Sequence, residues 1–164
     1  TVLVRTECDI LEGGALDYPD SVLKEFDYVL AAVHSKFTMP ERAMTDRVVA
    51  AVENPCVNVL AHPMAPLIGS RRPVELDFDE VFASCARTGT AIEINAGPTR
   101  MDLTGPQAQT AKTAGCVFAV DTDAHSGAEL AAMRFGVGTA RRAWLAATDV
   151  VNTWPLDRVR SFFR

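Results

Sequence analysis

The chain has 164 residues, of which 48% are hydrophobic and 23% are charged, values close to those of one soluble globular domain. Sixteen Lys and Arg against 21 Asp and Glu leave a net charge of −5, which argues against broad electrostatic binding along nucleic acid. No apolar run approaches the ~18 residues of a membrane span. The four cysteines form no C-x-x-C pair. We therefore expect a cytoplasmic protein with reduced cysteines and no membrane contact.

Five short apolar runs alternate with longer helical stretches along the chain. Polar or turn residues bound each run, as is typical of buried parallel strands. The expected strands are residues 2–4, 28–33, 57–61, 91–94 and 116–120.

Helical patterns fill the intervals between these runs. Met44, Val48 and Val52 recur at a spacing of four, which places them on one helix face. Gly89 and Gly115 follow two other patterns and are typical helix ends. The expected helices are residues 40–53, 77–87, 104–114, 127–135, 139–147 and 157–163. Strand followed by helix, repeated, predicts an α/β fold with a parallel sheet or barrel.

The three histidines all lie at or just beyond the end of an expected strand. They are His34, His62 and His125, and the first strand leads into Glu7 in the same way. Parallel strands end on one side of the sheet, and active sites of such folds are built there. We therefore expect these side chains to converge, together with Asp123 of the Asp-x-His segment.

Imidazole and carboxylate groups are the ligand set for Zn, Mn or Fe. Glu7, His34, His62, Asp123 and His125 are accordingly predicted to bind metal, and the last two are also the candidate catalytic residues. Bound metals of this kind activate water for phosphoester hydrolysis. A single histidine after a strand is most often an ordinary loop residue, so the prediction depends on the whole set.

Other polar residues near the strand ends are candidate substrate contacts. Arg72, next to Arg71, is either a phosphate clamp or part of an ordinary solvated pair. Asn95 and Arg100 lie just past the fourth expected strand and are predicted to contact substrate. Trp144 is expected to pack among the C-terminal helices.

Several segments, in this order, resemble the PHP (polymerase and histidinol phosphatase) superfamily, and most of all the C-terminal PHP domain of bacterial family X DNA polymerases. They are ECDI (7–10), FDYV (26–29), VHS (33–35), LAHP (60–63), AIEINA (91–96), RMDL (100–103) and DTDAHS (121–126). The resemblance implies a distorted (β/α)7 barrel with a site for two to three divalent metals. By that resemblance, Glu7 is the bridging carboxylate, His34 and His62 are the mid-chain ligands, and Asp123 and His125 are the closing pair.

The family opens with a His-x-His segment, and no histidine precedes His34 here. The chain is therefore expected to be a partial PHP domain over residues 1–164. It would contain about five βα units of the barrel, and the missing N-terminal part of the same barrel would supply the other ligands.

The resemblance implies a metal-dependent phosphoesterase that acts on DNA ends or AP sites, within a family X DNA polymerase or a related repair protein. Two alternatives are a phosphatase for a small monoester such as histidinol phosphate, and a non-catalytic structural module. A metal-dependent amidohydrolase is a weaker alternative, because none of Lys24, Lys36 and Lys112 lies where a bridging lysine is needed.

Overall fold

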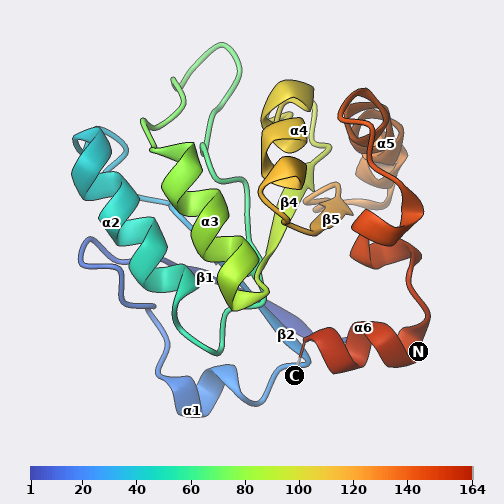
Figure 1. Ribbon diagram of the computed structural model, residues 1–164, viewed down its shortest axis with the longest axis horizontal. Coiled ribbons are helices and arrows are strands. Elements are labelled where there is room, and N and C mark those ends of the chain that lie inside the picture. The colour runs from blue at the N-terminus through green and yellow to red at the C-terminus, as the bar shows by residue number, and fades with distance from the viewer. Residues whose placement is uncertain (164) are drawn as a thin grey trace.

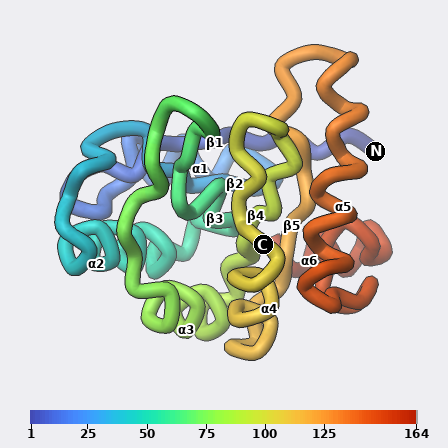
Figure 2. Tube along the Cα trace, turned by 90° about the horizontal axis from the view of Figure 1, so that it is seen from above, coloured from blue at the N-terminus to red at the C-terminus, as the bar shows by residue number. Residues whose placement is uncertain are grey.

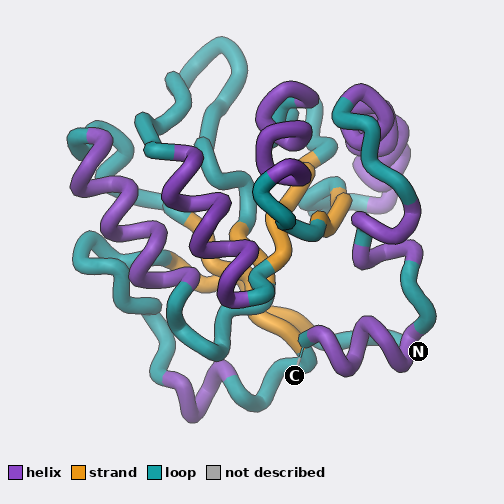
Figure 3. Tube along the Cα trace, in the orientation of Figure 1, coloured by secondary structure: helices purple, strands orange, loops and turns teal. Residues whose placement is uncertain are grey.

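A computed structural model describes residues 1–163, and its centre is a parallel sheet of five strands (Figures 1 and 3). The strands lie side by side in chain order, and each is hydrogen-bonded in parallel to the next. They are β1 (Arg5–Asp9), β2 (Tyr28–Ala32), β3 (Val59–Leu60), β4 (Ala91–Asn95) and β5 (Phe118–Asp121). This arrangement confirms the predicted α/β fold of about five βα units.

Four helices cover one face of the sheet, as the view from above makes clear (Figure 2). They are α2 (Glu41–Val52), α3 (Phe78–Thr88), α4 (Gly105–Thr113) and α5 (Met133–Arg142). The main core lies between these helices and the sheet, and it includes Met44, Phe82, Ile92 and Phe118. The short helix α1 (Asp20–Leu23) lies between β1 and β2 in the chain.

Local signals in the sequence account for the ends of the helices. The Asp77 carboxylate accepts the backbone N–H of Glu80 at 3.2 Å and caps the start of α3. The same helix ends at Gly89, whose φ of 77° is the left-handed conformation that glycine adopts without strain. Thr104 and Gln107 form a capping box at the start of α4.

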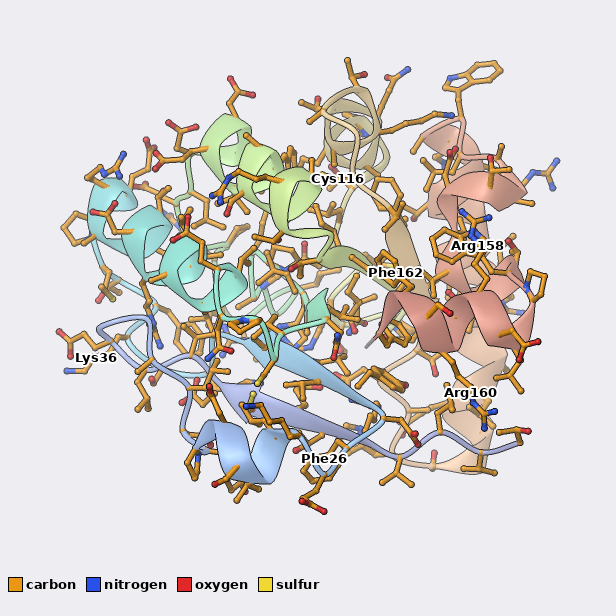
Figure 4. All side chains as sticks on the ribbon, turned by 60° about the horizontal axis from the view of Figure 1, so that its bottom comes forward. Phe26, Lys36, Cys116, Arg158, Arg160 and Phe162 are labelled. Atoms are coloured by element: carbon orange, nitrogen blue, oxygen red, sulfur yellow. The ribbon has the colours of Figure 1, made fainter. Side chains whose placement is uncertain are left out.

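The opposite face of the sheet is covered in part by α6 (Leu156–Phe162). Leu30, Val59 and Ala91 on that face form a second cluster, and Phe162 packs against it. Figure 4 looks onto this helix, from which Phe162 and Arg160 extend in opposite directions. The three-residue 3-10 helices η2 (Ala147–Asp149) and η3 (Val151–Thr153) connect α5 to α6.

Three local predictions were wrong. Residues 2–4 form no strand: β1 begins at Arg5, and Val2 is 88% exposed. Residues 127–135 and 139–147 are not two α-helices. The first stretch begins as the 3-10 helix η1 (Gly127–Ala132), and α5 then runs without a break through Gly136. Trp144, expected to pack, is 76% exposed.

Gly136 lies at a close contact between α5 and the sheet. A Cβ atom at this position would lie 2.7 Å from Val120 Cγ1 and 2.9 Å from the Cβ of Ala96. Both distances are shorter than a normal van der Waals contact. The missing side chain therefore lets the helix approach β4 and β5 closely.

Among the described helices, none has the length and apolar character that a membrane crossing requires. Cys8, Cys85 and Cys116 are buried and Cys56 is partly exposed, and all four are free thiols.

Arg47 joins the loops that follow β1 and β2. Its side chain is almost fully buried, and its guanidinium donates to the carbonyl oxygens of Ile10, Leu11 and Ser35. The first two acceptors follow β1 and the third follows β2. A buried cation with several carbonyl acceptors holds both strand ends in place.

We expect Arg47→Met to lower the free energy of unfolding by about 2–4 kcal/mol, because buried carbonyl groups lose a charged donor. Urea denaturation measures this loss. Arg87→Met is the matched control, since Arg87 is exposed and bonds to Glu53 and to the hydroxyl of Ser84, and it should change stability by less than about 1 kcal/mol. Equal effects of the two substitutions would contradict this role for Arg47.

Candidate metal centre

Glu7, His34 and His62 form a compact cluster of potential metal ligands. One ligand atom from each residue lies within 4.8 Å of the others. Glu7 Oε1 is 3.1 Å from His34 Nε2 and 3.3 Å from His62 Nε2, so one carboxylate oxygen faces both rings. The two imidazole rings meet edge to face, with centroids 5.4 Å apart.

The parallel register of three strands brings these residues together. Glu7 lies in β1 opposite Leu30 of β2, and therefore on the sheet face that Leu30 shares with the second cluster. His34 follows β2 and His62 follows β3 by two residues each. Residues 55 positions apart in sequence thus meet at one edge of the sheet.

Charge and hydrogen bonding in the cluster favour an ionised carboxylate. The pKa of Glu7 lies well below its ordinary value, chiefly because His34 and then His62 bond to its side chain, against the opposing effect of burial. The same bond to Glu7 raises the pKa of His34. In the metal-free chain, a proton therefore binds His34 more tightly than it binds an ordinary histidine.

Asp9 holds His34 from the other side of the ring. One Asp9 oxygen accepts the backbone N–H of His34 at 3.1 Å and lies 3.8 Å from its Nδ1. Sequence reasoning alone assigned no role to Asp9. The structure places it behind His34, in the position of a carboxylate that orients a ligating histidine.

A buried pair of acidic residues supports His62 in a similar way. The Glu93 side chain accepts the backbone N–H of His62 and is hydrogen-bonded to Asp121. Burial raises the pKa of both carboxyl groups, and their mutual bond raises that of Glu93 further while it lowers that of Asp121. Sequence reasoning assigned Glu93 no role in the site.

Asp123 and His125 lie on the loop after β5, outside the three-residue cluster. Asp123 has a φ of 48°, and its carboxylate is 3.4 Å from Nε of Arg100. His125 is exposed, and its Nδ1 is 2.7 Å from the carbonyl oxygen of Asp123. The two are thus joined to each other, and Asp123 is also paired with Arg100.

Arg100 lines a cavity of about 560 Å³. The cavity is lined by Arg100, Asp123 and residues of η1 and α5 that include Phe135. The charge of Arg100 acts on His34, where it opposes the rise in pKa that Glu7 causes. One guanidinium nitrogen, Nη1, is buried without a hydrogen-bond partner among the described residues.

The other two predicted substrate contacts differ in character. Asn95 is 1% exposed, and its amide bonds to Glu93 and to the backbone N–H of Gly97. Arg72 is exposed, whereas its neighbour Arg71 donates to the carbonyl of Ala65 and stacks on Phe37. Their contacts with substrate remain predictions.

The cluster fits a divalent metal in its chemistry. It offers one ionised carboxylate and two imidazoles, the donor set of many zinc and manganese sites. His62 is 1% exposed, and its Nδ1 has no hydrogen-bond partner in the described part of the chain. Nε2 of the same ring faces Glu7 at 3.3 Å, and a cation is the natural partner of all three side chains.

The sequence of the chain is similar to those of known proteins. No family model matches the chain. It is 39% identical over 163 residues to the DNA polymerase/3'-5' exonuclease PolX of Bacillus subtilis. The aligned region is 99% of this chain and 29% of PolX. The resemblance to the PHP superfamily is confirmed. A probable phosphatase of Thermoanaerobacter sp. (strain X514) is 27% identical over 162 residues, covering 93% of this chain and 64% of that protein.

A solved structure supports the PHP-type fold. Histidinol phosphate phosphatase from Lactococcus lactis, complexed with zinc, L-histidinol and phosphate, superposes with a TM-score of 0.57 at 15% identity. The match covers 77% of this chain and 61% of that chain. This chain therefore spans less than two thirds of each of these PHP relatives.

We predict that the chain binds Zn²⁺ more tightly at pH 8 than at pH 6. A proton on His34 must leave before metal binds, so affinity should rise by up to about tenfold per pH unit below the raised pKa of His34. Isothermal titration calorimetry at the two pH values measures this.

Glu7→Gln should weaken zinc binding at both pH values, whereas Glu75→Gln, which alters an exposed glutamate, should not. A dissociation constant that is the same at pH 6 and pH 8 would contradict the prediction.

Proposed function

We propose that this chain forms part of the active site of a metal-dependent phosphoesterase of the PHP type. The observation that carries the proposal is the arrangement of Glu7 between His34 and His62 at the carboxyl ends of parallel strands. The similarity to PolX and to probable phosphatases supports the same reaction class.

The residues of the chain have distinct roles in this proposal. Glu7, His34 and His62 hold a divalent metal (Zn, Mn or Fe), and Asp123 with His125 completes the binding of a second one. Metal held there supplies a Lewis acid that polarises a phosphoryl oxygen and acidifies water. Asp9 and Glu93 keep the two imidazoles in place, since they accept the backbone N–H groups of His34 and His62.

Arg100 is the proposed phosphate contact. Its Nη1 is buried and unpaired among residues 1–163, although the side chain as a whole borders the cavity beside Asp123. A phosphoryl oxygen is the acceptor that such a nitrogen lacks, and guanidinium and phosphate form strong charge-assisted bonds. Arg72, exposed on the loop after β3, is a weaker second candidate.

A DNA end or an AP site is the proposed substrate. The net charge of −5 suits a single end better than an extended duplex, and the 39% identity is to a 3'-5' exonuclease. A small phosphomonoester is the alternative substrate, supported by the fold shared with a histidinol phosphatase. We further propose that residues 1–164 hold part of a site for two to three metals, and that the rest of the same barrel supplies the other ligands.

The direct test is hydrolysis by the intact protein that carries this chain. Loaded with Mn²⁺ or Zn²⁺, it should release nucleotides from a 3′-labelled oligonucleotide, and Glu7→Gln should reduce the rate by about 100-fold. Glu75→Gln should leave the rate unchanged. Phosphate release from p-nitrophenyl phosphate alone would favour the monoesterase, and no hydrolysis of either substrate would favour a structural module.

Arg100→Met should raise KM for the oligonucleotide by about 10–100-fold, because a charge-assisted bond to phosphate is lost. Arg72→Met is the matched comparison and should raise KM by less. Steady-state kinetics of both variants measure the two KM values. A larger effect at Arg72 would assign the phosphate contact to the loop after β3 instead.

A further inference from the structure

Asp102 is a completely buried carboxyl group to which the proposed reaction assigns no role. Its Oδ2 accepts the backbone N–H groups of Met64 at 2.9 Å and Ala65 at 3.1 Å. Its own carbonyl oxygen accepts the N–H of Asn95 at the end of β4. The residue therefore connects the end of β4 to the loop that begins at His62.

That loop needs support, because its backbone is strained. His62 has a φ of 26° and Ala65 a φ of 47°, both in the left-handed region that disfavours residues with a Cβ. The two bonds to Asp102 fix the loop immediately after His62. Glu93 fixes the loop at the N–H of His62 itself.

Two complementary atoms on Asp102 and His62 are left without partners. Asp102 Oδ1 and His62 Nδ1 are both buried, and neither has a hydrogen-bond partner within the described residues. One is an acceptor, and the other is a donor when it carries the ring proton. Buried polar groups of this kind are rare in folded proteins unless they are satisfied by each other, by water or by a ligand.

The two side chains also interact electrostatically. Burial raises the pKa of the Asp102 carboxyl to about 6, and the bond from Met64 and the charge of His62 act in the opposite direction. His62 is thus close enough to affect the ionisation of Asp102.

The two histidines of the cluster differ at the second ring nitrogen. His34 directs Nε2 at Glu7 and Nδ1 toward Asp9. His62 directs Nε2 at Glu7 in the same way, and its Nδ1 is the atom without a partner. Nδ1 of His62 thus lacks the carboxylate that Asp9 supplies to Nδ1 of His34, and Asp102 is a buried carboxyl group whose Oδ1 is unpaired among the described residues.

We propose that Asp102 is the positioning residue of His62: its Oδ1 accepts the Nδ1 proton, directly or through one water molecule. When a metal replaces the direct contact between Nε2 and Glu7, this bond keeps the ring proton on Nδ1 and leaves the lone pair of Nε2 free to bind the metal. The inference rests on the proposed metal-binding function, and carboxylate–histidine–metal arrangements of this type orient ligands generally.

Asp102→Asn tests the tautomer with little change in shape. The amide oxygen must stay with the N–H groups of Met64 and Ala65, because only an acceptor satisfies them. The amide NH₂ then faces Nδ1 of His62 and requires that atom to accept, which moves the ring proton to Nε2. The loop keeps its support while the metal-binding lone pair is lost.

The first measurement uses the zinc-loaded full chain and needs no variant. Proton and nitrogen-15 NMR should show the Nδ1–H proton of His62 shifted downfield, as a hydrogen bond toward a carboxylate requires. In a folded Asp102→Asn that downfield shift should be lost. A wild-type His62 whose Nδ1–H proton has no downfield shift would overturn the proposal, even if the variant failed to fold.

The second measurement is zinc affinity, with folding checked by circular dichroism. Asp102→Asn should bind Zn²⁺ about 10–100-fold more weakly than the wild type. Asp77→Asn is the control, because that carboxylate also accepts a backbone N–H but lies at the start of α3. A folded Asp102→Asn with affinity within twofold of the wild type would overturn the proposal. Absence of zinc binding by the wild type would instead contradict the proposed function, and with it the role of Asp102.

Discussion

The carboxylate of Glu7 between two imidazole rings is the interaction on which the rest of the site depends. It exists only because β1, β2 and β3 are parallel and in one register, with Glu7 opposite Leu30. A slip of one residue would turn Glu7 toward the helices and remove the cluster. The helices α2 to α5 stabilise this register, since they bury the opposite face of the sheet, and Arg47 joins the loops that follow β1 and β2.

Around the cluster, each imidazole is held by acidic residues at its backbone or at its far nitrogen. Asp9 serves His34 in this way, and Glu93 and Asp102 lie around His62. The arrangement explains why so many carboxyl groups gather at one edge of the sheet. Their common effect is to fix two ring nitrogens toward one point, as a metal centre requires.

The sequence predicted those features of the site that follow from the order of strands along the chain. Strands that end in His34 and His62 predict convergence, because parallel strands end on one side, and the Glu7 cluster has that geometry. Asp102 was not singled out, because its importance comes from contacts with a loop 37 and 38 residues away. Arg47 was missed for the same reason: in sequence it is one charged residue of an amphipathic helix.

The errors in the predicted elements have a similar cause. Gly136 and Gly138 indicate a break when only local propensity is considered, yet Gly136 allows α5 to approach Val120 closely. Residues 2–4 have strand-like composition but lack a neighbour to pair with, and the ladder with β2 begins at Arg5. In each case tertiary packing overrides local preference.

The most direct test of the account is a crystal structure of the zinc-soaked chain, with anomalous diffraction recorded at the zinc absorption edge. If Glu7, His34 and His62 bind the metal, an anomalous peak should mark a zinc ion bound by Glu7 and by Nε2 of both histidines, with ligand distances of about 2.0–2.2 Å. A zinc peak located elsewhere, with these three side chains still bonded to one another, would contradict it.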